Sequence, residues 1–224
     1  MAKDISIIGK RKRIAVVGAG IGGLVSALKL ANDGFEVTVF ESSDYPGGKI
    51  RTIDSSCGPV NIGPTVLTML SVFQSLFEEV GENIFDHLEL KEQQILARHW
   101  WSDGTEFDLL ANKDDAFDEV RRVFGANSEK QFIKFYKSTE GMFDCFEKPI
   151  MRSSSPAALA ILKEICNNPK IIPALIPFLT LEKYLKNKFS EPKLQQLFGR
   201  YSTYVGGSPL NSPALMALVW QAEA

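Results

Sequence analysis

The sequence of 224 residues contains few cysteines and histidines and carries little net charge. Its three cysteines, Cys57, Cys145 and Cys166, are odd in number and far apart, which excludes a disulfide framework and a CxxC metal motif and is typical of a reducing cytosol. The two histidines, His87 and His99, are too few and too isolated for a histidine-based metal site, so we expect no metal. A net charge of −2 gives no indication of a nucleic-acid partner.

The sequence also lacks a hydrophobic run long enough to span a membrane, and its first ten residues do not resemble a signal peptide. The apolar stretch at 171–179 is broken by Pro173 and Pro177. It can lie in a membrane interface, line a tunnel for a long apolar substrate, or form a kinked core helix, and these alternatives stay open. The hydrophobic fraction of 45% is typical of a soluble globular protein of one or two domains.

A glycine-rich motif lies between two predicted strands. The apolar run at 14–17 is typical of a strand buried on both faces, and leucines at helical spacing over 24–30 predict a helix that Gly34 ends. Polar and apolar residues alternate over 36–40, which predicts a second strand, and Glu41 lies at the carboxyl end of that strand. The order strand, helix, strand predicts a Rossmann-like α/β unit.

The glycines of this motif have the GxGxxG spacing of a dinucleotide-binding loop. Gly18 permits a tight turn, Gly20 lets the backbone approach a pyrophosphate at the helix amino terminus, and Gly23 lets the helix pack closely on the sheet. Glu41 can accept hydrogen bonds from an adenosine ribose, and its charge would repel a 2′-phosphate. The alternative, a glycine-rich turn without a ligand, is disfavoured by the complete strand–helix–strand context. The predicted adenine-dinucleotide site comprises Gly18, Ala19, Gly20, Ile21, Gly22, Gly23, Glu41 and Ser42.

A second glycine motif follows within a few residues. Gly47 and Gly48, followed by Lys49 and Arg51, resemble the double-glycine signature of flavoproteins with two dinucleotide-binding domains. That superfamily includes amine oxidases, protoporphyrinogen oxidases, carotenoid desaturases and the non-enzymatic Rab GDP-dissociation inhibitors. The resemblance implies FAD rather than NAD, with Gly48 admitting backbone amides to the cofactor and Lys49 or Arg51 adding positive charge near its phosphates. The alternative is an ordinary turn with a solvated basic flank.

Residues 54–69 resemble the loop and helix start of bacterial phytoene-desaturase-type enzymes. In that family the segment corresponding to Gly63, Pro64 and Thr65 lies against the flavin. Thr65 can also cap a helix predicted over 66–80 and ended by Gly81, so a capped helix without a flavin is the plainer alternative.

The composition changes after residue 81, which predicts a dinucleotide-binding domain over 1–81 and a second region over 82–224. The pattern of this second region predicts a helix-rich α+β substrate domain that is inserted into the dinucleotide-binding domain. The expected elements are strands over 88–96 and 97–109 with a hairpin turn at Asp103-Gly104, and helices over 112–124 and 128–146 capped by Asp114 and Ser128.

The stretch at 197–223 resembles the hydroxyneurosporene (methoxyneurosporene) desaturase branch of the phytoene-desaturase family, in which an Arg-Tyr-x-Thr-Tyr-Val-Gly-Gly-Ser-Pro run recurs. Arg200, Tyr201 and Tyr204 are the candidates for substrate-pocket residues, with hydrogen bonding within the structure as the alternative role for each. A helix is expected to begin near Ser212-Pro213, with proline at its first position.

The resemblance implies a Rossmann-like α/β FAD-binding fold with an inserted substrate domain, in an enzyme that desaturates an apolar carotenoid. Oxidised FAD would accept a hydride equivalent from the polyene while a carbon–carbon double bond forms. Because such a substrate dissolves in membranes, we expect a cytoplasmic protein peripherally attached to one. No catalytic acid or base stands out, so catalytic residues stay unknown.

Family members run considerably further, so the chain is expected to be an amino-terminal part whose fold is incomplete at the carboxyl terminus. Two alternatives remain: another FAD-dependent oxidase or saturase of the amine-oxidase superfamily, and a lipid-binding relative such as a Rab GDP-dissociation inhibitor. The sequence leaves open the particular carotenoid, the number of desaturation steps, the electron acceptor and the oligomeric state.

Overall fold

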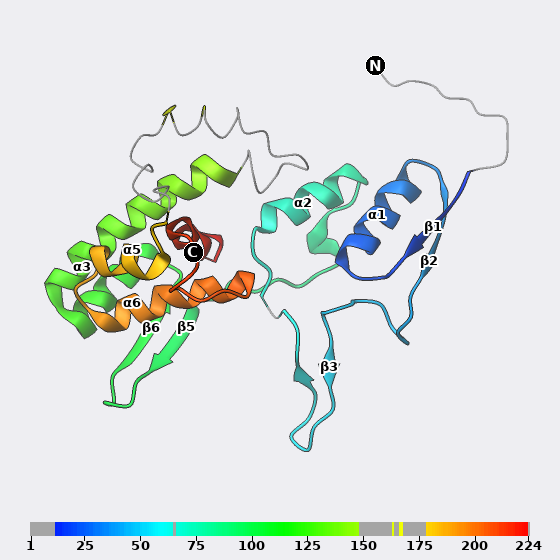
Figure 1. Ribbon diagram of the computed structural model, residues 1–224. Coiled ribbons are helices and arrows are strands. Elements are labelled where there is room, and N and C mark those ends of the chain that lie inside the picture. Colours follow the sequence, from blue (N-terminus) through cyan, green and yellow to red (C-terminus); the bar gives the residue numbers. More distant parts are fainter. Residues whose placement is uncertain (1–11, 65, 148–162, 164–165, 168–177, 224) are drawn as a thin grey trace. The chain divides into compact units, whose positions relative to one another are not determined.

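The computed structural model describes residues 12–64, 66–147, 163, 166–167 and 178–223 (Figure 1). The chain splits into two compact units, Met1–Leu90 and Lys91–Ala224. Thr65 and residues 171–177 of the proline-broken apolar stretch lie outside the described residues.

The first unit begins with the strand–helix–strand order that the glycine motif predicts. Strand β1 (Arg13–Val17) leads into helix α1 (Ile21–Asn32), and β2 (Glu36–Phe40) pairs parallel with β1 in the register Ile14↔Val37 (Figure 1). Both strands contain β-branched residues, which favour extended backbone, and α1 contains leucines at helical spacing. The predicted Rossmann-like unit is therefore confirmed.

Glycine ends α1 as expected. Gly34 has a φ of 90°, a left-handed backbone that strains residues with a side chain. The N–H of Gly34 donates to Ala31 at 3.0 Å and that of Phe35 to Leu30 at 3.1 Å, which satisfies the last carbonyls of the helix. This termination returns the chain directly into β2.

The rest of this unit contains a short antiparallel pair, β3 (Thr52–Ile53) and β4 (Val60–Asn61), followed by helix α2 (Leu70–Glu79) and a 3₁₀ turn, η1 (Ile84–Asp86). Lys29 of α1 forms an ion pair with Glu79 of α2 at 2.5 Å.

The expected start of α2 is wrong. The sequence predicts a helix from residue 66, but Met69 has a φ of 53°, which breaks the helical backbone path until Leu70. The predicted end is confirmed, because Gly81 has a φ of 80° immediately after the helix.

Apolar surface in the first unit is largely uncovered. Among the described residues of this unit, the buried apolar side chains are Ala19 and Ile84. Val17 is 88% exposed and Phe40 56% exposed, although residues 14–17 read as a strand buried on both faces. That expectation is not met, because among the described residues this sheet has two strands and α1 has no buried residue.

The second unit begins with a β-hairpin packed on a long helix. Strands β5 (Ile95–Trp100) and β6 (Glu106–Leu110) are antiparallel, and Gly104 turns between them with a φ of 82°. The predicted hairpin is confirmed, but residues 88–94 do not form the predicted strand.

Helix α3 (Lys113–Phe146) contains the two helices expected from sequence, with a break at Gly125, whose φ is 85°. Its cap differs from expectation. Asn112 accepts hydrogen bonds from the N–H groups of Asp114 and Asp115, whereas Ser128 is buried within the helix. Asn112, two residues before Asp114, satisfies these free N–H groups, so Asp114 lies in the first turn instead.

The second unit ends in short helices that close an aromatic core. These are α5 (Leu181–Lys188), α6 (Pro192–Gly199), and the 3₁₀ helices η4 (Arg200–Val205) and η5 (Ala214–Ala222). Pro213 caps η5 rather than occupying its first position, and this element is a 3₁₀ helix instead of the expected α-helix.

Aromatic rings fill this core. Phe198 of α6 lies 4.7 Å from Phe135 of α3 and 5.3 Å from Trp220 of η5, measured between ring centroids. The indole N–H of Trp220 donates to the hydroxyl of Thr139 at 2.9 Å, so a buried polar bond joins η5 to α3. In the described part of the chain, no helix is both long and apolar enough to cross a membrane.

Candidate dinucleotide-binding site

The first glycine loop has a geometry that only glycine fits well. Gly18 leaves β1 with a φ of 95°, and its N–H donates to the carbonyl of Phe40 at 2.7 Å. A Cβ at Gly23 would lie 1.9 Å from the carbonyl oxygen of Gly18, closer than real Cβ contacts allow. A side chain at Gly23 would therefore force β1 and α1 apart, and a side chain at Gly18 would strain the left-handed backbone.

Helix α1 begins at this loop with its first N–H groups available. Gly20 is the N-cap, no side chain caps the helix, and its first turn contains no acidic residue. The helix dipole and these N–H groups favour a negatively charged ligand at this end. The start of α1 is thus suited to a phosphate.

The second glycine motif packs against the first, backbone to backbone. The N–H of Gly47 donates to the carbonyl of Ala19 at 2.8 Å. A Cβ on Gly48 would lie 3.1 Å from the Cα of Gly20, and Gly48 itself has a φ of 61°. The two motifs, which α1 and β2 separate in the sequence, therefore form one glycine-lined surface. Gly47 belongs to the double-glycine signature recognised in the sequence, but its hydrogen bond to Ala19 was not predicted.

Glu41 is fixed at the edge of this surface. Its Oε2 accepts the N–H of Ala19 at 2.6 Å, and its Oε1 accepts the N–H of Ser43 at 2.9 Å and the hydroxyl of Ser42 at 3.2 Å. The hydrogen bond from Ala19, followed by that from Ser43, lowers the pKa of Glu41 to about 2. The carboxylate is therefore charged at neutral pH and can accept further hydrogen bonds, as from ribose hydroxyls.

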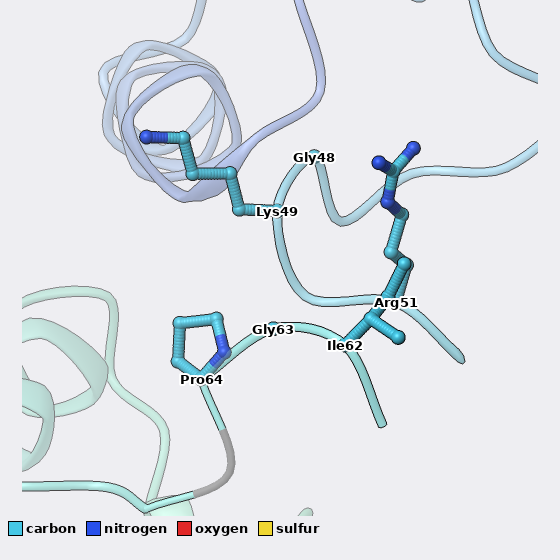
Figure 2. A pocket seen from close by; sticks show the side chains of 6 residues that line it. All are labelled: Gly48, Lys49, Arg51, Ile62, Gly63 and Pro64. Carbon is cyan, nitrogen blue, oxygen red and sulfur yellow. The ribbon is translucent and has the colours of Figure 1, made fainter. Parts of the chain in front are cut away.

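A cavity of about 400 Å³ adjoins the second glycine motif. Figure 2 shows Gly48, Lys49 and Arg51 on one side of it and Ile62, Gly63 and Pro64 on the other, with the two cationic side chains extending in different directions. A Cβ at Gly63 would lie 1.8 Å from the carbonyl oxygen of Lys49, so glycine is needed there for the two segments to approach.

The candidate residues fall into two groups. The first unit holds the dinucleotide candidates from Gly18 to Gly23, together with Glu41, Ser42, Gly48, Lys49, Gly63 and Pro64. The second unit holds the substrate candidates Arg200, Tyr201 and Tyr204, and the rings of the two tyrosines stack 5.7 Å apart. Thr65 lies outside the described residues. Among the residues described, no group of His, Cys, Asp and Glu is placed to hold a metal ion.

Comparisons with known proteins agree with this geometry. Residues 16–80 match the model of the NAD(P)-binding Rossmann-like domain family. The chain is 44% identical to hydroxyneurosporene desaturase of Cereibacter sphaeroides over 95% of its own length and 43% of that protein. It is 32% identical to 1-hydroxycarotenoid 3,4-desaturase of Flavobacterium sp., covering 93% of this chain and 42% of that protein. The chain thus spans less than half the length of these relatives.

Solved structures show the same fold. Putrescine oxidase bound to putrescine aligns with a TM-score of 0.55 at 20% identity, covering 95% of this chain and 41% of that one. Cyclohexylamine oxidase of Brevibacterium oxydans aligns with a TM-score of 0.53 at 16% identity over the same shares. The predicted fold class is confirmed, with a Rossmann-like site for a flavin or other dinucleotide. Over the part of their length that it spans, the chain is similar to bacterial carotenoid desaturases.

Proposed function

We propose that the protein is an FAD-dependent oxidoreductase that desaturates a carotenoid polyene, such as hydroxyneurosporene or phytoene. The observation that carries this proposal is the joined glycine surface, in which Gly48 contacts Gly20 and Glu41 holds Ala19, in a chain that is 44% identical to a hydroxyneurosporene desaturase. The first motif alone suits any dinucleotide; the second motif packed against it favours FAD.

The chain offers a distinct group to each part of the cofactor. The uncapped start of α1 suits the pyrophosphate, and Glu41 suits the adenosine ribose. Lys49 and Arg51 line the neighbouring cavity and have no carboxylate within ion-pair distance among the described residues, so their charge is available to phosphates. When bound, FAD supplies the hydride acceptor, and the protein orients cofactor and substrate and excludes water.

Peripheral contact with a membrane is part of this proposal. A carotenoid dissolves in the bilayer, so an enzyme that acts on it has to collect its substrate from the membrane. The candidate pocket residues Arg200, Tyr201 and Tyr204 lie on η4, where Tyr204 is 56% exposed.

The test uses the full-length gene product in cells that accumulate hydroxyneurosporene or phytoene. We expect extracted pigments to show a polyene absorption shifted to longer wavelength, with retention changed to that of a more unsaturated carotenoid. Unchanged pigment from a flavin-loaded protein would contradict desaturation of both substrates. A purified protein that cannot be loaded with FAD would contradict the cofactor assignment.

Two alanine variants separate cofactor binding from folding. In Gly20→Ala the new Cβ clears Gly48 at 4.0 Å, so the loop keeps its structure while a methyl group occupies the space for pyrophosphate. The matched control is Ser26→Ala, on the same helix but outside the predicted dinucleotide site, where the native hydroxyl donates to the carbonyl of Gly22 at 2.8 Å. We expect the first to weaken FAD retention about tenfold or more and the second to retain FAD and activity.

A further inference from the structure

A cavity of about 260 Å³ lies between the outer face of the β5–β6 hairpin and α3. All of its lining residues belong to the second unit, so it is distinct from the cavity at the second glycine motif. Its walls are formed by charged side chains and one indole, which are those of Arg98, Trp100, Glu106, Asp108, Glu119 and Arg122. None of these six residues is among the candidates for cofactor or substrate binding.

The register of the hairpin places four of these side chains on one face. Trp100 pairs with Glu106 across the two strands, and Arg98 pairs with Asp108. Residues two apart on a strand point to the same side, so these four lie together, whereas Phe107 between them is 1% exposed in the core. The Cβ atoms of directly opposed residues lie about 5 Å apart, so Trp100 and Glu106 rise from neighbouring points of this face.

Both arginines of the cavity are already bonded to carboxylates. Arg98 donates from Nε and Nη2 to the two carboxylate oxygens of Asp108, each at 2.7 Å. Arg122 donates in the same way to Glu119, each bond 2.6 Å long. These hydrogen bonds lower the pKa of both acids, so their carboxylates are charged at neutral pH. Each pair is therefore neutral as a unit and gives little attraction to an anion.

Glu106 and Trp100 have no such partners. Within the described part of the chain, the Glu106 carboxylate forms no hydrogen bond or ion pair, and no cation or aromatic ring lies over the Trp100 indole. The charge of Glu106 acts on Arg98 without a direct contact between them. Trp100 is 65% exposed. The cavity thus combines one negative charge beyond its internal pairs with an open aromatic face.

A carboxylate beside an aromatic face is the combination that attracts an organic cation. An ammonium group gains from the quadrupole of the indole and from a charge-assisted hydrogen bond to the carboxylate. A quaternary ammonium is usually held by a cage of several rings, and this cavity has one. A primary ammonium instead brings three N–H donors, which match Glu106 and the lone pairs that Asp108 and Glu119 keep.

We propose that this cavity binds a primary ammonium group, with Glu106 accepting its hydrogen bonds and Trp100 contacting its alkyl stem. Two sources carry this chemistry: a soluble alkylamine, and the ethanolamine headgroup of a phospholipid. The second source would bring this face of the hairpin against a membrane. The inference does not depend on carotenoid desaturation, because it concerns binding at a separate site.

The experiment uses the full-length, FAD-loaded gene product and one probe for each source. Calorimetry compares ethanolamine with ethylene glycol, which has a similar size and no charge. Flotation compares vesicles of phosphatidylcholine alone with vesicles that also contain phosphatidylethanolamine. The variants are Glu106→Gln, which removes the charge and keeps the shape, and Trp100→Leu, which removes the exposed indole. The control is Glu92→Gln, the same change at an exposed residue outside the cavity.

We expect a preference for the ammonium compound of about tenfold or more in at least one arm. A preference in calorimetry identifies a soluble amine as sufficient, and one confined to vesicles identifies the lipid headgroup. Glu106→Gln should reduce the affinity about tenfold and Trp100→Leu about two- to fivefold, with the control unchanged.

Two results would overturn the inference: no preference in either arm, or a preference that Glu106→Gln leaves intact. Circular dichroism and the flavin content of each variant show that any loss comes from the cavity and not from unfolding. Neither readout requires turnover, so a protein that desaturates no carotenoid contradicts the proposed function and still decides whether the cavity binds an ammonium group.

Discussion

The hydrogen bond between Thr139 and Trp220 provides a quantitative test of how the second unit is held together. Thr139 is fully buried, and its hydroxyl accepts the indole N–H of Trp220 at 2.9 Å and the side-chain amide of Gln221 at 3.0 Å. The bond spans 81 positions and attaches η5 to α3. Because Glu223 follows η5 directly, this attachment also supports the hydrogen bond from the Tyr201 hydroxyl to Glu223, 2.7 Å long.

Replacing Thr139 by valine keeps the volume and removes the hydroxyl. Gln221 is partly exposed and can turn to water, but Trp220 is 2% exposed, so its N–H would stay buried without a partner. That loss is worth about 1–3 kcal/mol of unfolding free energy. In Thr139→Val combined with Trp220→Phe the orphaned N–H is gone, so the two changes should cost about 1–2 kcal/mol less together than the sum of their separate costs.

Urea unfolding followed by far-UV circular dichroism measures all four proteins of this cycle. Thr139→Ser is the control, because it keeps the hydroxyl and loses one methyl group, at a cost of about 1 kcal/mol. A coupling between Thr139 and Trp220 below about 0.5 kcal/mol would refute the reasoning. So would a valine variant that is as stable as the unmodified protein.

Three further predictions concern the glycine loop and the hairpin. Gly23→Ala should destabilise the first unit by roughly 1–3 kcal/mol and abolish FAD retention, because its Cβ would lie 1.9 Å from the Gly18 carbonyl; thermal unfolding that matches the unmodified protein would contradict this. The contribution of charged Glu41 to stability should be complete above pH 4.5 and lost as the pH falls toward 2; NMR titration of the Ala19 amide, with Glu41→Gln as the control, would show a midpoint near 4.5 if the contact were unimportant. The ion pair between Arg98 and Asp108, 2.7 Å apart, should show a weak coupling that falls further in high salt, and a strong, salt-independent coupling in a double-mutant cycle would count against this.

Glycines made much of the first unit predictable from the sequence. Gly18, Gly34 and Gly81 each occupy left-handed backbone at a position where the sequence indicates a turn or a helix end. Such positions depend on local backbone geometry, which residue type determines almost alone. The break at Gly125 was predictable for the same reason, since it separates two amphipathic segments.

Contacts between distant segments were not predictable in this way. Nothing local in the sequence places Gly48 against Gly20, or Glu223 beside Tyr201. The cap of α3 was missed for a smaller reason: Asn112 and Asp114 are both good caps, and only backbone geometry distinguishes them.

The uncovered strands of the first unit have a practical consequence for handling this chain. Among the described residues, β1 and β2 pair only with each other, so each leaves one row of backbone N–H and carbonyl groups open. Exposed Val17 and Phe40 lie along these strands. Open, apolar strand edges recruit further strands from neighbouring molecules. Purified at high concentration by itself, the chain should therefore aggregate through edge-to-edge pairing, and charged substitutions at these two positions should raise its solubility.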